Sequence, residues 1–286
     1  MEPRQIPSRA VTHAGKFHAD DVFSSALLRL LQPGLEISRV YQVPEGFDGL
    51  AFDVGWGEFD HHQKGAPLRE NGVPYAAFGL LWRAFGAQFL EQGCSPEDAA
   101  REAARFDEEF VQPLDLDDNT GCGHPLASVI GCFNPAWDSD RPADQCFWEA
   151  VAFASTVLQK KAEDIWAVNR ASDLVRKALS RMKDGIVVLE KYCPWKMILK
   201  PSPALFVVYP SQRGGYGAQV VPDKETGEPL VDFPAAWAGK PAEELQRLTG
   251  IPTLRFCHNG RFLVTADTQE DAVAACRLAR QAGEKK

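Results

Sequence analysis

Apolar positions in the first part of the chain alternate between short segments and one longer stretch with the period of a helix. Residues 10–11, 37–43 and 50–52 are short apolar segments that predict strands, whereas apolar residues within 22–31 recur on one helix face. Pro33-Gly34 ends that helix, because neither residue favours a continued α-helix. Strands and helices in alternation predict an α/β fold with a mainly parallel sheet flanked by helices.

The next segments predict longer helices. Residues 76–92 place aromatic and aliphatic side chains on one helix face. Ser95 followed by Pro96 supplies the capping residue and first-turn proline that open a further helix, here toward Phe110. Residues 146–182 are mostly helical in pattern, and we interpret them as a connector that packs against the first domain and leads out of it.

The rest of the chain predicts a smaller α/β domain. Lys183-Asp184-Gly185 is the best domain boundary, because the aspartate and glycine favour a turn. We therefore predict a first domain at 1–182, which includes the helical connector, and a second domain at 183–286. The second domain has predicted strands at 186–189, 205–209, 217–221, 253–256 and 262–265, and predicted helices at 241–248 and 268–281.

The composition is that of a globular protein large enough for two domains. Of the 286 residues, 45% are hydrophobic, which is sufficient for a substantial core. No apolar run approaches the ~18 residues of a membrane span, and the sequence begins without an apolar signal core, so we expect no membrane insertion and a cytoplasmic location. Seven cysteines without a CxxC pair argue against a disulfide framework and a zinc ribbon.

Charge is unevenly distributed along the chain, whose net charge is −8. Residues 1–125 hold 10 Lys and Arg against 20 Asp and Glu, a balance of −10, which leaves +2 for the remainder. An acidic protein binds polyanions poorly in general. Bound cations would explain the acidic first half, and a nucleic-acid substrate would then be short or single-stranded rather than a long duplex.

Candidate chemistry concentrates in two runs, THAGKFHADD at 12–21 and DVGWGEFDHHQ at 53–63. Four of the six histidines lie there, together with four aspartates. Each run follows a predicted strand, and ligands gather outside the carboxyl ends of the strands in open α/β sheets, so both runs can line one crevice. Nitrogen and oxygen donors without cysteine favour Mn²⁺ or Mg²⁺ over a structural Zn²⁺ site. The residues are His13, His18, Asp20, Asp21, Asp53, Asp60, His61 and His62.

These runs resemble the motifs of a known family. FDHHQ, preceded by DVG and by the THxGxFHxD run, resembles the DHH phosphoesterase superfamily and, within it, the melanocyte-proliferating-gene exonuclease family. Further patches in the same order extend the resemblance over nearly the whole chain, and it implies a two-domain DHH phosphoesterase-like fold. The patches are LDLDDN (114–119), NPAWD (134–138), CPWK (193–196), QVVP (219–222) and GIPTLRFCHNGRF (250–262).

The resemblance implies a site for two Mn²⁺ ions, with Mg²⁺ as an alternative. Asp53 is the implied bridging ligand, and Asp60 would orient one imidazole, as carboxylates commonly do beside ligating histidines. The implied ligands are His13, His18, Asp20, Asp53, His61 and Asp118.

The chain departs from the family pattern at three places. The wider superfamily has an aspartate where His18 falls, so the ion that His18 serves stays open, and Trp56 stands where a glycine is usual. In the third place Thr120 stands between Asn119 and Gly121, so Asp115 and Asp117 are alternatives to Asp118, and LDLDDN can also be an ordinary solvated loop.

The implied activity is metal-dependent hydrolysis of phosphoric esters by a 3′–5′ exonuclease that acts on single-stranded RNA or short oligonucleotides. Asp53, His62 and Arg261 would be its catalytic residues, with Asp53 joining the two ions and the other two stabilising phosphoryl charge. An Asn-Gly pair between two strand patterns also allows a simpler interpretation of 258–261 as a hairpin turn. The implied substrate-binding residues are His62, Lys64, His258, Asn259 and Arg261.

Two other interpretations stay open. The same site could hydrolyse a small nucleotide or pyrophosphate, and turnover confined to dimers and mononucleotides would favour this alternative. A second alternative is a non-catalytic regulatory protein that binds metal or nucleotide. A homo-oligomer is compatible with each interpretation.

Overall fold

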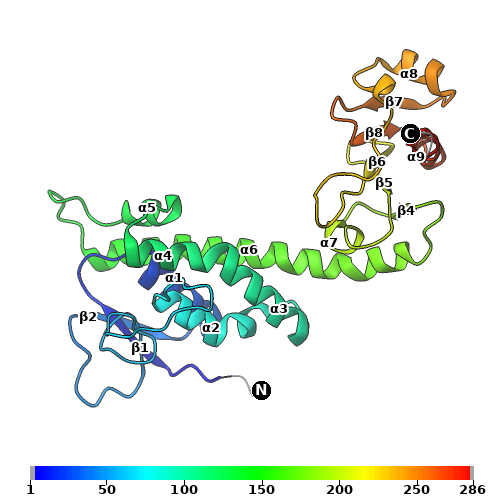
Figure 1. Ribbon diagram of the computed structural model, residues 1–286. Coiled ribbons are helices and arrows are strands. Elements are labelled where there is room, and N and C mark those ends of the chain that lie inside the picture. Colours follow the sequence, from blue (N-terminus) through cyan, green and yellow to red (C-terminus); the bar gives the residue numbers. More distant parts are fainter. Residues whose placement is uncertain (1–3, 284–286) are drawn as a thin grey trace. The chain divides into compact units, whose positions relative to one another are not determined.

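The computed structural model describes residues 4–283 and has an α/β architecture (Figure 1). The chain divides into two compact units, Met1–Trp166 and Ala167–Lys286. A sheet and helices are present in each, so the predicted α/β class is confirmed.

The division between the units falls inside helix α6 (Ala143–Leu179), whereas the sequence placed the domain boundary at the turn after this helix. Packing explains the position of the division. Ala171 and Val175 in the last part of α6 are buried in a hydrophobic cluster with Val207 and other residues of the second unit.

The first unit is built on a three-stranded parallel sheet, as predicted. β1 (Arg9–His13) lies in the middle, between β2 (Glu36–Val40) and β3 (Leu50–Ala51). Because the strands run parallel, their carboxyl ends share one edge of the sheet. His13 at the end of β1 and Asp53 just after β3 therefore meet at this edge.

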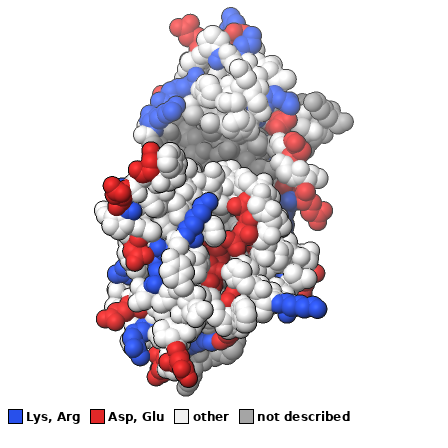
Figure 2. All heavy atoms as spheres, turned by 90° about the vertical axis from the view of Figure 1, so that its left-hand side faces the viewer, with Lys and Arg blue, Asp and Glu red and all other residues white. Residues whose placement is uncertain are grey.

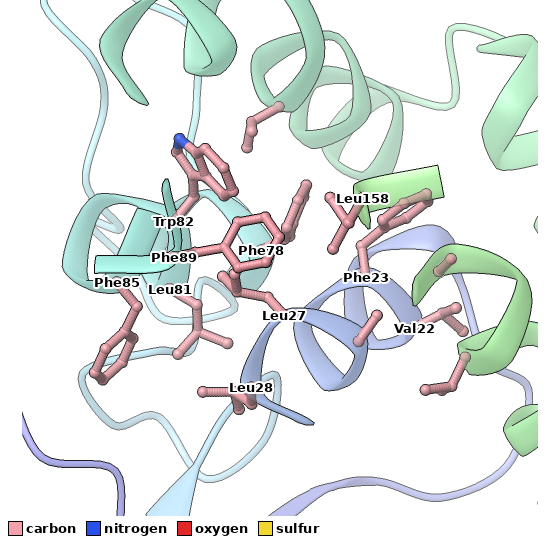
Figure 3. Close-up of a cluster of buried hydrophobic side chains, with 14 of the residues drawn as sticks. Val22, Phe23, Leu27, Leu28, Phe78, Leu81, Trp82, Phe85, Phe89 and Leu158 are labelled. Atoms are coloured by element: carbon pink, nitrogen blue, oxygen red, sulfur yellow. The ribbon is translucent and has the colours of Figure 1, made fainter. Parts of the chain in front are cut away.

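Helices α1 (Ala19–Leu31) and α2 (Ala77–Leu90) supply much of the apolar core of the first unit. The rings of Phe23 and Phe78 lie 5.5 Å apart between them, and Leu158 of α6 joins the same cluster (Figure 3). Each fully buried side chain of this size contributes about 1.5–3 kcal/mol relative to exposure. The helical patterns predicted for both segments are confirmed, and this packing fixes the N-terminus of α1 beside the sheet edge.

A continuous helical segment follows, formed by α3 (Pro96–Phe106), a π-helical turn η1 (Asp107–Val111) and α4 (Gln112–Thr120). The predicted cap is confirmed, because the Asp98 amide donates to Ser95 Oγ at 3.2 Å.

The interpretation of LDLDDN as a solvated loop is wrong, because residues 114–119 lie in α4. Pro113 is in the first turn of this helix, where its missing N–H leaves no hydrogen bond unmade. The helix ends at Gly121, whose φ of 65° is the left-handed conformation typical of a residue just past a helix. The short helix α5 (Pro125–Gly131) follows and was not predicted.

The second unit contains a mixed five-stranded sheet in the order β4-β5-β6-β8-β7. β4 and β5 are parallel and the other neighbours are antiparallel. All five strands were predicted from the sequence. They are β4 (Ile186–Val188), β5 (Phe206–Pro210), β6 (Tyr216–Val220), β7 (Leu254–Cys257) and β8 (Leu263–Ala266).

Helices α8 (Ala242–Thr249) and α9 (Gln269–Gly283) bury one face of this sheet and were also predicted. Two elements were missed, α7 (Lys196–Leu199) and the 3₁₀ turn η2 (Ala235–Trp237), because they are too short to show a hydrophobic period. Within residues 4–283, no helix combines the length and the apolar character needed to cross a bilayer.

Candidate metal centre

The two runs singled out in the sequence meet at the carboxyl edge of the parallel sheet. Asp53 follows β3 with a φ of 54°, a left-handed conformation that is uncommon outside glycine. Its amide donates to the carbonyl of Phe59 at 2.9 Å, which draws the segment containing His61 back over the end of β3. Asp53, in this uncommon conformation, thus lies where the end of β3 meets the segment that carries His61.

His13 lies between two carboxylates. Its Nε2 is 3.2 Å from Oδ2 of Asp21 and 3.2 Å from Oδ2 of Asp53. Asp21 is fully buried in the first turn of α1, where its Oδ1 accepts the backbone amide of His18 at 2.8 Å. The N-terminus of α1 therefore presents the free oxygen of Asp21 to the strand end.

His61 lies between the other carboxylates. Its Nε2 is 3.1 Å from Oδ2 of Asp118, and its Nδ1 is 3.7 Å from Oδ1 of Asp53 and 3.9 Å from Oδ2 of Asp20. Asp20 is fixed by the amides of Ala77 and Phe78 at the start of α2, which donate to its two oxygens at 3.0 and 2.6 Å. Asp53 thus has one oxygen near each histidine.

Three groups in the described part of the chain could hold a metal ion, each with its ligand atoms within 4.8 Å of one another. Asp53 belongs to two of them, and its use as a bridging ligand stays a prediction. The groups are Asp53, Asp60, His61 and His62; His13, Asp21 and Asp53; and Asp20, His61 and Asp118.

Several polar atoms of this cluster are buried without a hydrogen bond. Among the described residues, Asp21 Oδ2, Asp53 Oδ1 and His61 Nδ1 have no hydrogen-bond partner. Buried polar atoms are normally paired, since leaving one unpaired costs about 1–3 kcal/mol. A divalent cation coordinated by these atoms would remove that cost, so the residues fit the metal ions that the sequence predicts.

Proton affinities in the cluster lead to the same conclusion. Burial, together with the charges of Asp53 and Asp118, raises the pKa of Asp20 well above its ordinary value. Burial also raises the pKa of Asp21 to about 7, although His13 opposes the shift. Burial and the neighbouring negative charges thus disfavour the ionised form of Asp20 and Asp21, and a bound cation would offset this cost.

The two histidines shift in the sense expected beside carboxylates. Burial lowers the pKa of His13, but the hydrogen bond to Asp53 and the charges of Asp21 and Asp53 outweigh it and raise the value to about 9. For His61 burial again opposes the shift, and the hydrogen bond to Asp118 raises the pKa. Both imidazoles therefore lie in a strongly negative environment.

Asp60 orients the second histidine of the pair, His62. Its Oδ1 lies 2.7 Å from His62 Nδ1, and it also accepts the backbone amides of Trp56 and His62 at 2.7 and 3.1 Å. Burial raises the pKa of Asp60, but these hydrogen bonds outweigh it and the pKa is lowered. His62 is half exposed and stacks on His61 at 4.3 Å, so a fixed imidazole edge faces the solvent.

The structure gives each of the three alternative aspartates in α4 a different environment. Asp115 is buried against Arg69 (Oδ2 to Nη2, 2.8 Å), and Oδ1 of Asp117 accepts the amides of Gly123 and His124. Only Asp118 faces His61. Of the three, Asp118 is the one placed to serve as a metal ligand.

The remaining sequence candidates lie outside these groups. His18 lines the recess beside His13, with the ring centroids 5.8 Å apart, but the groups contain Asp21 in its place. Asp21 was noticed in the sequence without being assigned as a ligand. Lys64 is exposed on the turn after the histidine pair, whereas Lys16, which the sequence did not single out, lines the recess.

His258, Asn259 and Arg261 belong to the second unit and lie in the connection from β7 to β8. His258 Nδ1 accepts the amide of Gly260 at 2.9 Å, as expected for the hairpin interpretation, and Arg261 pairs with Asp232 (Nη2 to Oδ2, 2.7 Å). Their use in substrate binding stays a prediction.

Several residues of the candidate metal cluster line a recess of about 760 Å³. Figure 2 shows acidic side chains gathered in a hollow on this face. The recess is lined by residues of both runs and of α4, among them His13, His18, Asp53, His61, His62 and Asp118.

Comparison with known proteins gives one family. A family model described as the uncharacterised protein family UPF0160, MYG1 exonuclease, matches residues 9–280. The chain belongs to this family. The MYG1 exonuclease of Homo sapiens is 29% identical over 95% of this chain and 85% of its own length, and that of Rattus norvegicus is 29% identical over 95% and 84%. A MYG1 protein of Schizosaccharomyces pombe is 26% identical over 95% and 97%. No solved structure matches the chain.

Membership of the MYG1 exonuclease family confirms the resemblance drawn from the sequence motifs. The matched region includes both the candidate metal cluster of the first unit and the sheet of the second. The second unit is therefore part of what this family shares.

Proposed function

We propose that the chain is a metal-dependent phosphoesterase of the DHH type, and within that class an exonuclease that removes nucleotides from single-stranded RNA or short oligonucleotides. The observation that carries the proposal is the convergence of Asp20, Asp53, His13, His61 and Asp118 on shared points, with buried atoms that lack partners. The relatives of Rattus norvegicus and Homo sapiens are MYG1 exonucleases, and their name supports the same reaction class.

Two ions would be held at this cluster, one by His13 and Asp21 and the other by Asp20, His61 and Asp118, and Asp53, which lies near both His13 and His61, would contribute to both. The donor set of imidazole and carboxylate suits Mn²⁺, with Mg²⁺ as the alternative. When bound, such ions lower the pKa of water and neutralise charge on phosphoryl oxygens.

The chain's own residues would position the substrate. His62 is held through Nδ1 by Asp60 and lines the recess, and with both ring nitrogens protonated its Nε2 would donate a hydrogen bond to a phosphoryl oxygen. Lys16 lines the same recess and supplies a positive charge for a neighbouring phosphate. The 3′–5′ direction and the roles of Lys64 and Arg261 are carried over from the family resemblance.

One observation favours a second candidate substrate, a small nucleotide or dinucleotide. Residues 1–125 have a balance of −10, so a long polyanion would be repelled from most of this unit. A recess of about 760 Å³ falls within the roughly 300–1,000 Å³ range of small-molecule pockets.

Hydrolysis of a length series, from dinucleotides to long single strands of RNA and DNA with Mn²⁺ or Mg²⁺, tests the proposal. We expect Asp53→Asn to lower the rate by at least roughly 100-fold, because losing one metal contact commonly costs this much. Asp48→Asn removes a carboxylate from an exposed site in the same unit and should retain activity.

Turnover confined to dinucleotides would select the small-molecule alternative. If the wild-type protein hydrolysed no member of the series with either metal, the enzymatic proposal would be wrong and a regulatory binding protein would remain.

A further inference from the structure

One face of the sheet in the second unit is only partly covered. α8 and α9 bury the face that carries Phe206, Ala218 and Val264, and the end of α6 together with α7 covers Val207 on the opposite face. Farther along that opposite face lies an open hollow of about 630 Å³. Its lining includes Tyr192, Tyr209, Arg213, Gly217, Arg255 and Phe256.

Aromatic side chains stand on two sides of the hollow. Tyr192 is 53% exposed, and its ring centroid lies 5.0 Å from that of Tyr209 on β5. Phe256 on β7 is 42% exposed. β6 and β8 lie between them and contribute Gly217 and Thr265 to the lining, so the two aromatic sides are about three strand spacings, or roughly 14 Å, apart.

Gly217 is required in this arrangement. A Cβ atom at this position would lie 2.9 Å from the ring of Tyr209. The absence of a side chain lets Tyr209 lie flat across β6, where its hydroxyl donates to Gln219 Oε1 at 3.1 Å. The middle of the hollow therefore stays shallow and open between its aromatic sides.

A β-bulge directs two consecutive side chains of β7 into the hollow. The register of β7 against β8 shifts between Leu254 and Phe256, which leaves Arg255 as the extra residue. Neighbours in a regular strand point to opposite faces. Here Arg255 and Phe256 both line the hollow, while Leu254 and Cys257 are buried in the cluster with α9. Bulges often re-aim side chains beside functional sites.

The charge at the hollow is positive. Arg255 donates to the carbonyl of Gly214 at 2.7 Å and pairs with Asp267 at 3.1 Å, so it fixes the turn that carries Arg213. Arg213 is exposed and has no ion-pair partner in the part of the chain that the structure describes. No Asp or Glu side chain of residues 4–283 lines the hollow. A ligand with flat rings and negative charge would complement these groups.

We propose that this hollow, which we call the stacking face, binds single-stranded nucleic acid, with bases stacked on Tyr192 and Phe256 and a phosphate beside Arg213. Aromatic rings stack on every base, so such binding tolerates any sequence. Open sheets with exposed aromatic side chains bind single-stranded RNA in this way in other folds. The choice of nucleic acid as ligand rests on the proposed function, and the stacking face adds a strand-holding surface to it.

Affinity of the whole chain for a fluorescent single-stranded oligonucleotide, measured by anisotropy in EDTA, tests the stacking face apart from metal binding. We expect Tyr192→Ala and Phe256→Ala each to weaken binding by roughly 5- to 100-fold, the usual effect of losing one stacked base. Arg213→Ser should weaken binding and reduce its salt dependence. The matched controls Leu248→Ala and Arg247→Ser alter exposed residues of α8 and should bind as wild type.

Tyr192→Phe keeps the ring and should retain affinity, which separates stacking from loss of fold. Unchanged affinity in folded Tyr192→Ala and Phe256→Ala proteins would overturn the proposal, as would an equal loss in the α8 controls. A change in oligomeric state without a change in affinity would assign this face to contact between copies of the chain and would also overturn it.

Hydrolysis of bis(p-nitrophenyl) phosphate with Mn²⁺ distinguishes this inference from the proposed function. If Tyr192→Ala lowers oligonucleotide affinity while no ester or oligonucleotide is hydrolysed by the wild type, the stacking face stands and the nuclease proposal fails. If the small ester is hydrolysed and the aromatic variants bind normally, the nuclease proposal stands and the stacking face fails.

Discussion

Asp53 occupies a backbone conformation that suits few residues, with a φ of 54°. The conformation places its carboxylate between His13 and His61, one oxygen near each. Uncommon conformations persist where the surroundings over-determine them, and they cluster at functional sites. Here the amide hydrogen bond to Phe59 holds the turn, so the position of a single carboxylate depends on the whole DHH segment.

Asp60 allows a prediction about His62 alone. Asp60→Asn would keep the volume of the Asp60 side chain but remove the negative charge that holds the His62 imidazole through Nδ1. We expect hydrolysis to fall by roughly 10- to 100-fold, the usual effect of losing such an orienting partner. Steady-state kinetics with Mn²⁺ and a short oligonucleotide would measure the change.

The fall should appear mainly in kcat, and metal affinity measured by calorimetry should change less than in Asp53→Asn. A loss of metal binding as large as in Asp53→Asn would mean that Asp60 is itself a ligand, as its place in one of the candidate groups allows.

Individual residues also show which parts of the candidate site could be predicted from the sequence. The histidines and aspartates of the two runs were found because each run is short and follows a strand end. The sequence motifs assigned His18 rather than Asp21 as a ligand, although the two lie three residues apart around the start of α1. The position and rotation of α1 against the sheet decide that Asp21 joins a candidate group while His18 lines the recess.

At the scale of elements, α4 decides which acidic residue reaches the cluster. Successive residues of a helix are rotated by about 100°, so Asp115, Asp117 and Asp118 face different directions. Their order in the sequence does not reveal the rotation of the helix. The structure resolves it through Arg69, which pairs with Asp115 and Asp107, while Asp118 contacts His61.

Removal of Arg69 should therefore destabilise the first unit. Arg69 is buried and bonds to Asp107, to Asp115 and to the carbonyl of Pro74. Arg69→Ala would leave Asp115 buried without its partner, and we expect a loss of about 3–5 kcal/mol in the free energy of unfolding. Urea denaturation followed by circular dichroism would measure it.

Two further variants make this measurement specific. Arg141→Ala breaks an exposed pair with Glu149 and should leave the unfolding midpoint nearly unchanged. Adding Asp115→Asn to Arg69→Ala should recover part of the loss, since the unpaired charge is then gone. A loss in Arg69→Ala no greater than in Arg141→Ala would contradict the buried-pair argument.

At the scale of the whole molecule, the α/β class and the parallel first sheet followed from hydrophobic pattern alone. The mixed sheet of the second unit was predicted strand by strand, but its order and the bulge in β7 depend on long-range pairing that no local pattern encodes. The division inside α6 likewise depends on what Ala171 and Val175 contact. A cytoplasmic location and a homo-oligomer stay predictions.

We predict that metal ions bound by the buried acidic residues stabilise the folded first unit. An ion that binds only the folded state adds about 2.7 kcal/mol at a concentration 100 times its Kd. We expect Mn²⁺ to raise the thermal unfolding midpoint and EDTA to lower it, as measured by scanning calorimetry.

Asp53→Asn serves as the control for this shift. The variant should unfold at nearly the same temperature with and without Mn²⁺, whereas Asp48→Asn should respond like the wild type. An equal response in Asp53→Asn would place the stabilising ion somewhere other than the cluster described above.

The π-helical turn η1 sits between α3 and α4 and holds one backbone residue more than an α-helical turn would accommodate. The wider turn therefore sets the direction in which each side chain of α4 points around the helix axis. If 107–111 were wound as regular α-helix without losing a residue, each residue would rotate farther about the axis, and α4 would turn so that Asp118 moved away from His61. Register at this one point, rather than the identity of the acidic residues, thus governs which of three neighbouring carboxylates completes the cluster.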